Sequence, residues 1–333
     1  MADGICVPCS YFTESKMIEM PAKILVSTEN LPYADWLEYR KLGIGGSDAS
    51  VVCGINRYKS PVELWMEKTN QLQAQEAGEA AYWGTQLESI VRSEFTKRTG
   101  IEVRKLDVIL QSEEHPFMLA NLDGICEVPD LGTCIFEAKT ASAYKAAEWE
   151  DTIPDEYQLQ IQHYMAVTGY KGAYIAVLIG GNTFRWKFVE RDEELIAMLT
   201  ELERDFWRHV EDGTPPPLDG SDASARFLAE RFPTSTPKSH ITLPDTAADL
   251  LAQYDEACEE LEAVTERKQK AENLLKEMMG ENEVGTAGGR VITWKSVAQE
   301  RLDSKTLKAE HPTLCKKYTN KTSYRRFTIR AAS

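Results

Sequence analysis

The chain has 333 residues, of which 42% are hydrophobic, so it is long enough to bury one main core and to carry a smaller appendage. It contains no run of about 18 apolar residues, and its N-terminus lacks a basic start followed by an apolar core, so we expect neither a membrane span nor a secretion signal. Seven scattered cysteines fit a reducing, cytoplasmic compartment. The net charge of -15 argues against a protein that coats nucleic acid non-specifically, but not against an enzyme that contacts DNA locally.

The first part of the chain carries few structural signals. Residues 1–30 are expected to be irregular, and residues 34–41 to form a short helix. Cys6 and Cys9 have the spacing of metal ligands, but a structural zinc or iron–sulfur site needs about four ligands. The other cysteines provide no second pair of this kind, so the spacing alone does not indicate a metal site.

A glycine-rich turn over residues 43–46 leads into Ser47 and Asp48, which we expect to cap a helix over Ala49–Cys53. Free backbone N–H groups at such a turn suit a phosphate. Arg40 lies just upstream and could add a bidentate contact. Glycine turns before helices are common, so this pattern is weak when taken alone.

A helix is predicted from Ser60 to Lys68, and a longer one over residues 78–100. Glu88 lies beside the apolar stripe of the longer helix. Its carboxylate is either held by a neighbouring basic residue at the edge of the core or aimed into a cleft as a ligand. The stripe itself consists of Leu87, Ile90, Val91 and Phe95.

The middle of the chain alternates strands and helices. This order predicts an α/β sandwich with a mixed central β-sheet, followed by a boundary at residues 213–217, which contain three prolines. The predicted strands are Glu102–Gln111, Phe117–Ala120, Ile135–Lys139, Gly172–Ile179 and Phe184–Val189, and the predicted helices run from Pro154 to Gly169 and over Asp192–Val210.

Residues 219–333 are predicted to form an appendage to this domain. A polar stretch over residues 219–240 precedes one long helix or a helical pair over residues 243–279, with a coiled-coil character. A hairpin around Gly288 and Gly289 and a last strand in YRRFTIR are expected to follow. Residues 290–333 contain eleven Lys or Arg and three Asp or Glu, which makes this tail a candidate contact for nucleic acid or a partner, or else a solvated basic face.

Acidic groups interrupt the apolar run from residue 119 to 139. In the strand that ends it, Ile135, Glu137 and Lys139 share one face because strand side chains alternate. An acid and an amine on such a strand are costly to bury without compensation. Asp123, then a hairpin, then Glu137 and Lys139 therefore indicate a magnesium-dependent nuclease centre, with a surface hairpin and one salt bridge as the alternative.

Five motifs follow one another along the chain, namely RKLGIGGSDAS (40–50), WGTQLES (83–89), LANLDG (119–124), EAK (137–139) and YQLQIQHYMAVTG (157–169). In sequence and in order they resemble the YqaJ-type viral recombinase nucleases, relatives of the phage lambda exonuclease in the PD-(D/E)xK nuclease superfamily. The resemblance covers roughly residues 30 to 215.

The resemblance implies a restriction-endonuclease-like core and an exonuclease that uses two Mg²⁺ ions, or Mn²⁺. Such an enzyme resects linear duplex DNA from 5′ to 3′ and supplies single strands for phage-type recombination. The implied site consists of metal ligands at Glu88, Asp123, Glu137 and the Ala138 carbonyl, a catalytic lysine at Lys139, an ordering glutamine at Gln160, and a grip on the 5′-phosphate by Arg40 and Ser47.

The same resemblance implies partners and a location. We expect double-stranded DNA ends as substrate, a single-strand annealing protein as partner, and a homo-oligomeric ring, a trimer by family analogy. The protein is expected in the cytoplasm of a bacterial host, encoded by a phage or prophage. The implied domains are residues 1–30 as an irregular segment, 31–218 as the exonuclease domain and 219–333 as the appendage.

Two other functions fit parts of the sequence. One is a RecB-like or CRISPR-associated nuclease with an iron–sulfur cluster, against which the isolated Cys6 and Cys9 pair argues. The other is a non-catalytic DNA-end-binding scaffold that recruits an annealing protein. The presence of Glu88, Glu137 and Lys139 together with Asp123 argues against the scaffold.

Overall fold

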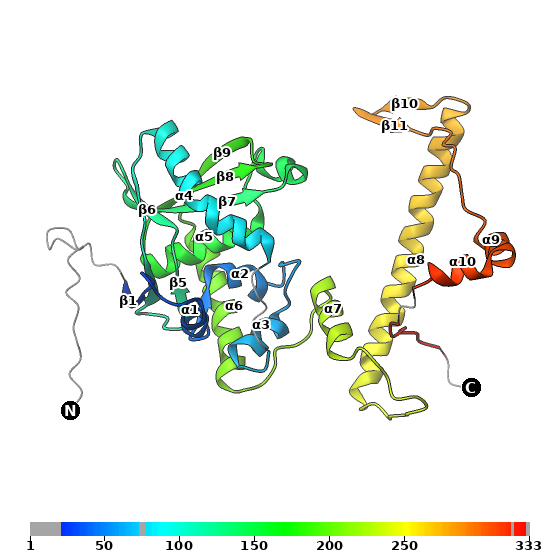
Figure 1. The fold of residues 1–333 in the computed structure, drawn as a ribbon, viewed down its shortest axis with the longest axis horizontal. Coiled ribbons are helices and arrows are strands. Elements are labelled where there is room, and N and C mark those ends of the chain that lie inside the picture. The colour runs from blue at the N-terminus through cyan, green and yellow to red at the C-terminus, as the bar shows by residue number, and fades with distance from the viewer. Residues whose placement is uncertain (1–20, 73–77, 321–322, 331–333) are drawn as a thin grey trace. The chain divides into compact units, whose positions relative to one another are not determined.

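The apolar run from Gly172 to Ile179 forms strand β8, an interior strand of the main sheet, as its near-continuous hydrophobic pattern predicts (Figure 1). The structure is a computed structural model that describes residues 21–72, 78–320 and 323–330. The main sheet has five strands in the order β3-β6-β7-β8-β9, antiparallel except for the parallel pair β7 and β8. The other four strands are β3 (Val103–Arg104), β6 (Gly124–Val128), β7 (Gly132–Ala141) and β9 (Thr183–Glu190).

Two helices cover the faces of this sheet. Helix α4 (Glu79–Thr99) packs Val91 and Phe95 on the face that presents Phe136. Helix α5 (Asp155–Thr168) packs on the opposite face, which presents Ile135. The predicted α/β class with a mixed sheet between helices is therefore confirmed.

A second, four-stranded sheet lies in the same unit, in the order β1-β4-β5-β2. It consists of β1 (Ala22–Ser27), β4 (Val108–Ser112), β5 (Met118–Ala120) and β2 (Ile44–Gly45). The remaining helices of this part are α1 (Tyr33–Arg40), α2 (Gly46–Val52), α3 (Pro61–Lys68) and α6 (Glu193–Glu211), with a 3₁₀ segment at Ala143–Trp149. None of the helices in the described ranges is long and apolar enough to cross a bilayer.

Three predictions about the first unit are wrong. The single strand expected over residues 102–111 is two strands in different sheets, because the charged pair Lys105 and Asp107 lies exposed at the crossing between them. The segment expected to be irregular contains β1, which pairs with β4. Ile90 is 55% exposed, because α4 buries only a narrow stripe against the sheet.

The boundary between the two compact units also differs from the prediction. The first unit ends at Arg231 rather than at residue 218. The polar stretch beyond residue 218 contains helix α7 (Asp222–Arg231), which buries Ala223 and Phe227. The Asp219 carboxylate accepts hydrogen bonds from side and main chain just before this helix, a local start signal that the polar composition concealed.

The second unit runs from Phe232 to Ser333 and contains one long helix, α8 (Thr246–Met279), rather than a helical pair. The hairpin β10 (Val284–Ala287) and β11 (Arg290–Thr293) turns at two glycines with positive φ, as predicted. Helices α9 (Ser304–Glu310) and α10 (Pro312–Lys317) were not predicted. The last strand expected in YRRFTIR does not form, since no described strand pairs with it. The Cys6 and Cys9 pair lies outside the described residues.

A buried ion pair ties together three elements of the first unit. His163 of α5 and Glu203 of α6 are both fully buried, with Nδ1 of the imidazole 2.8 Å from the nearer carboxylate oxygen. The other ring nitrogen, Nε2, lies 2.8 Å from the Leu119 carbonyl of β5, so it carries a hydrogen. The pair thereby fixes the strand that leads to Asp123.

We expect Glu203→Ala to lower the free energy of unfolding by about 3–5 kcal/mol, because it leaves a buried imidazole without its charge partner. Glu201→Ala is the matched control: the same residue type on the same helix, but 67% exposed at the side chain, with an expected change within about 0.5 kcal/mol. Urea denaturation measures both. Equal changes in the two variants would contradict a structural role for the buried pair.

Candidate active site

Strand β7 and the residue before β6 bring an acid pair and a lysine to one end of the main sheet. Glu137 and Lys139 project from the same face of β7, toward α5, and Glu137 is only 2% exposed. Asp123 immediately precedes β6, the antiparallel neighbour of β7. Its carboxylate accepts a hydrogen bond from the Ala138 backbone N–H at 2.8 Å, which fixes it beside Glu137.

Helix α5 completes a hydrogen-bonded network around Glu137. Oε1 of Glu137 accepts hydrogen bonds from Lys139 Nζ and from Gln160 Nε2, each at a distance of 2.7 Å. Lys139 also donates to Gln160 Oε1 at 2.9 Å and lies 4.8 Å from the ring centroid of Tyr157. Gln160 Nε2 donates further to the Tyr164 hydroxyl at 3.1 Å. Three side chains of α5 therefore hold one oxygen of the carboxylate and the lysine in place, while the other oxygen, Oε2, is buried without a hydrogen-bond partner.

Glu88 reaches the same region from helix α4. It pairs with Arg92 one turn further along the helix, at 3.5 Å. Arg92 also donates to the Asp123 carbonyl at 3.0 Å. Arg92 thus holds Glu88 and also positions the backbone of Asp123. Of the two possibilities that the sequence left open for Glu88, both apply: it is paired with a neighbouring basic residue, and it lines the cavity.

The acids of the site repel one another. Burial, together with the Asp123 charge, raises the pKa of Glu137 to about 8, against the opposing effect of Lys139. Burial also raises the pKa of Asp123 and, together with the Asp123 charge, that of Glu88. Burial would lower the pKa of Lys139, but Glu137 and Asp123 outweigh it and raise that pKa. If all three acids were ionised they would carry one more charge than Lys139 and Arg92 neutralise, and the site relieves this by favouring a proton on Glu137.

A second cluster lies around Arg40. Its guanidinium donates from Nη2 to Ser47 Oγ and to Asp48 Oδ1, each at 3.0 Å, and lies 5.0 Å from the Trp36 ring centroid. Asp48 is buried, and its carboxylate also accepts a hydrogen bond from Lys68 Nζ at 2.8 Å. Although burial raises the pKa of Asp48, Lys68 and Arg40 outweigh it and hold that pKa well below its usual range. Asp48 remains ionised and orients Arg40 toward Ser47.

Both clusters face one cavity of about 450 Å³ in the first unit. Six of the residues that the sequence singled out line it, namely Arg40, Ser47, Glu88, Asp123, Glu137 and Gln160. Lys139 joins them through its hydrogen bonds to Glu137 and Gln160. The structure thus brings together side chains that are separated by up to about 120 residues of chain.

The donor set fits a hard divalent cation. Glu88, Asp123 and Glu137 offer carboxylate oxygens on one cavity, and one oxygen of Glu137 is buried without a partner. In the part of the chain that the structure describes, no three His, Cys, Asp or Glu side chains stand close enough together to hold a metal ion as they are placed. These carboxylates would have to move closer together to bind an ion.

Sequence reasoning missed several residues of the site. The sequence alone gives Tyr157 and Tyr164 no role in the site, although Tyr164 stands four residues after Gln160 and so lies on the same helix face. The same spacing relates Arg92 to Glu88. No local pattern signals the long-range pair of Asp48 with Lys68.

The predicted cap of the helix after the glycine turn is wrong in position. Helix α2 begins at Gly46 rather than Ala49, with Gly45 as N-cap. Asp48 lies inside the first turn, where its carboxylate accepts from the Gly45 N–H at 3.1 Å. The helix starts early because the Asp48 side chain caps it from within the first turn. The same carboxylate also accepts hydrogen bonds from Lys68 and Arg40.

Comparison with known proteins gives the family. Residues 35–171 match the model of the YqaJ-like viral recombinase domain. The chain is also 40% identical over 322 residues to the uncharacterized protein YqaJ of Bacillus subtilis strain 168, covering 95% of this chain and 100% of that protein. The chain therefore belongs to the YqaJ-like viral recombinase family, which confirms the resemblance inferred from its motifs.

Solved structures show partial likeness. An alkaline exonuclease from Laribacter hongkongensis, LHK-Exo, matches with 20% identity and a TM-score of 0.46, over 60% of this chain and 97% of that chain. A phage-related exonuclease from Haemophilus somnus 129PT matches with 14% identity and a TM-score of 0.40, over 54% of this chain and 99% of that chain. These are likenesses of part of the fold.

Gly46 lets α2 approach α5 at the site. A Cβ atom at this position would lie 2.4 Å from the Tyr164 ring and 3.0 Å from the Gln160 side chain. We expect Gly46→Ala to lower the free energy of unfolding by about 1–3 kcal/mol, since the ring has to move. Thermal or urea unfolding measures the effect.

Gly84→Ala is the control for this substitution. Gly84 lies inside helix α4, where an added Cβ meets nothing within 4 Å, so alanine should stabilise the protein by about 0.5–1 kcal/mol. A Gly46→Ala variant as stable as the parent protein would show that the contact between α2 and α5 is looser than the structure indicates.

Proposed function

We propose that this protein is a Mg²⁺-dependent DNA exonuclease that resects linear duplex DNA, from 5′ to 3′, and supplies single strands for phage-type recombination. The observation that supports it most is the Glu137 carboxylate, held on one oxygen by Lys139 and Gln160 and unpartnered on the other. This carboxylate shares a cavity with two further acids and with Arg40. Membership of the viral recombinase family agrees with this function.

Glu88, Asp123 and Glu137 are the proposed ligands of one or two Mg²⁺ ions, with Mn²⁺ as a substitute. The Ala138 carbonyl is a further proposed ligand. Within a strand, the N–H and C=O of one residue point to the same side, and the Ala138 N–H points to Asp123. Bound Mg²⁺ would supply the positive charge that offsets these acids and polarises a phosphate.

Lys139 and Gln160 act on the reacting groups through their fixed positions. The Lys139 ammonium is held by two acceptors, Glu137 Oε1 and Gln160 Oε1, whose side chains line the cavity, so it has one orientation beside them. From there it donates a hydrogen bond to the attacking water or to an oxygen of the scissile phosphate. Gln160 holds both Glu137 and Lys139 and is a positioning residue.

Recognition of the DNA end is assigned to Arg40 and Ser47. These side chains line the same cavity as the acids, and Asp48 and Trp36 hold the guanidinium in place. A guanidinium and a hydroxyl side by side are suitable donors to a terminal phosphate. A 5′-phosphate held here would place a nearby phosphodiester beside Glu137, which accounts for the proposed polarity.

The wider setting follows the family. We propose that the protein acts in the cytoplasm of a bacterial host, as a homo-oligomeric ring on DNA ends, with a single-strand annealing protein as its partner. The basic tail is a candidate contact for that partner or for DNA.

An exonuclease explains the site better than the other two functions. A DNA-end-binding scaffold needs no buried carboxylate with an unpartnered oxygen, because such a group costs stability without adding affinity. An iron–sulfur nuclease needs about four clustered cysteines, whereas Cys258 and Cys315 lie on α8 and α10 of the second unit. An absorbance spectrum of the purified protein without a band in the visible range tests the cluster directly.

We expect Glu137→Gln and Lys139→Ala each to reduce Mg²⁺-dependent degradation of duplex DNA by at least about 100-fold, because each removes charge at the reacting phosphate. Both variants should remain folded. The matched control is Glu127→Gln, on the neighbouring strand β6, where the side chain is exposed and hydrogen-bonded to Thr133. It should retain full activity.

The assay compares end-labelled linear duplex with covalently closed circular duplex, with and without Mg²⁺. Degradation of the linear substrate alone, lost on addition of EDTA, is the expected result. Cleavage of the circle would indicate an endonuclease, and binding without degradation would indicate a scaffold. Full activity of Glu137→Gln would contradict the assignment of the site.

Arg40→Ala is expected to remove the preference for 5′-phosphorylated ends. The rate on phosphorylated ends should fall by about 10-fold or more, because a charged hydrogen bond to phosphate is worth roughly 1.5–3 kcal/mol. The rate on unphosphorylated ends should change little. Arg40→Lys is the informative companion, since it retains the charge without the planar fork. An equal loss on both kinds of end would argue against a phosphate contact at Arg40.

A further inference from the structure

Helix α8 carries a seven-residue hydrophobic repeat that the proposed nuclease site does not use. The repeat runs over about five heptads, with Lys268 as its one charged member, which is the pattern of a coiled-coil strand. The first core position is occupied by Ala247, Tyr254, Leu261, Lys268 and Leu275, and the second by Leu250, Ala257, Val264, Ala271 and Met278.

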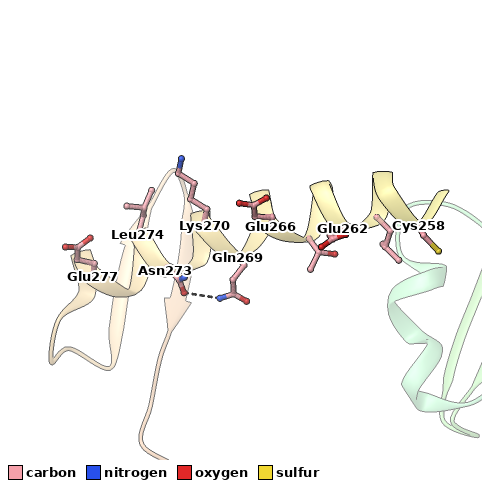
Figure 2. Close-up of a pocket in the computed structure, with 10 residues that line it drawn as sticks. Cys258, Glu262, Glu266, Gln269, Lys270, Asn273, Leu274 and Glu277 are labelled. Atoms are coloured by element: carbon pink, nitrogen blue, oxygen red, sulfur yellow. Dashed lines mark hydrogen bonds between the residues drawn. The ribbon is translucent and has the colours of Figure 1, made fainter. Parts of the chain in front are cut away.

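The large residues of this seam are exposed in the structure. Leu261 is 67% exposed and Met278 is 80% exposed. The hollow along the helix in Figure 2 is lined by residues of α8 alone, lies on a largely polar face and meets the seam at Leu261. An apolar seam on a helix of 34 residues, about 50 Å long, is stabilised when a second helix covers it.

The charges of α8 are distributed unequally along its length. Residues 246–262 contain six Asp or Glu and no Lys or Arg, whereas residues 263–279 contain three Asp or Glu and four Lys or Arg. A second copy running parallel would set one acidic half against the other. A second copy running antiparallel would set each acidic half against the basic half of its neighbour, which favours the antiparallel arrangement.

The sizes of the seam residues agree with the same arrangement. In a fully overlapped antiparallel pair, each small residue faces a larger one: Ala271 faces Tyr254, Ala257 faces Lys268, and Ala247 faces Met278. Leu261 then faces Val264, and Leu250 faces Leu275. In a parallel pair, each alanine would face its own copy and leave the seam under-filled.

Three charged residues in and beside the seam distinguish the arrangements further. A parallel pair would bring Lys268 against Lys268 of the second copy inside the seam, where like charges are costly. An antiparallel pair separates them. It also brings Glu260 at the edge of the seam beside Arg267 of the second copy, twice by symmetry.

We propose that α8 is the surface through which two copies of this chain associate, as an antiparallel two-stranded coiled coil. The association is independent of the cavity that holds Glu137. If the nuclease units themselves form rings, α8 joins subunits in pairs and doubles the mass of the assembly.

The first test is the mass of the full-length protein in solution, measured by light scattering or sedimentation. Leu261→Glu places a carboxylate in the seam, so the assembly should fall to half its mass while its nuclease activity per chain persists. Ala263→Glu adds the same charge on the outer face of the same helix, and the mass should not change. A parent protein and a Leu261→Glu variant of equal mass would overturn the proposal, provided that circular dichroism shows equal helix content.

The second test fixes the direction of the two helices. Arg267→Glu should weaken association by about tenfold, because it sets two glutamates side by side at two symmetric places. Adding Glu260→Arg should restore association in an antiparallel pair. In a parallel pair, Arg267 would instead face Glu272 of the second copy, so restoration by Glu272→Arg rather than by Glu260→Arg would overturn the antiparallel arrangement.

Discussion

The buried carboxylate of Glu137 is the group on which the arrangement of the site depends. Strand β7 fixes its backbone between two paired strands, and Lys139 and Gln160 hold one of its oxygens. The other oxygen has no partner, and two further acids share its cavity. Such an arrangement is costly in an isolated protein. In the proposed nuclease, a divalent cation and the phosphate backbone of DNA would occupy the cavity and offset this cost.

Helix α5 connects this site to the core. One face of the helix presents Gln160 and Tyr164 to the acids, and another buries His163 against Glu203. The imidazole also contacts the carbonyl of Leu119, just ahead of the loop that carries Asp123. The buried pair therefore links the helix side of the site to the strand that leads to Asp123. Rigid support of this kind is what a phosphoryl-transfer site requires, because small displacements of the reacting groups reduce the rate strongly.

Much of the fold could be predicted from the sequence, because its strongest signals are local. The run over β8, the cap at Asp192 and the glycine that ends α5 each carry their own physical signature. The strand alternation around Glu137 placed it with Lys139, and the family motifs singled out the residues that share the cavity. The break between β3 and β4 was missed although the exposed pair Lys105 and Asp107 marks it locally, and helix α7 was missed because the polar composition concealed its start signal at Asp219. The pair of Asp48 with Lys68 was missed because it joins residues far apart in the chain.

The central claim is that Asp123 and Glu137, with Glu88, hold divalent cations in their shared cavity. The most direct measurement is the anomalous scattering of a crystal of the protein grown with Mn²⁺. The account predicts an anomalous peak bounded by the carboxylates of Asp123 and Glu137 and by the Ala138 carbonyl, absent from crystals of Glu137→Gln. An empty cavity at millimolar Mn²⁺, with Oε2 of Glu137 still unpartnered, would contradict it.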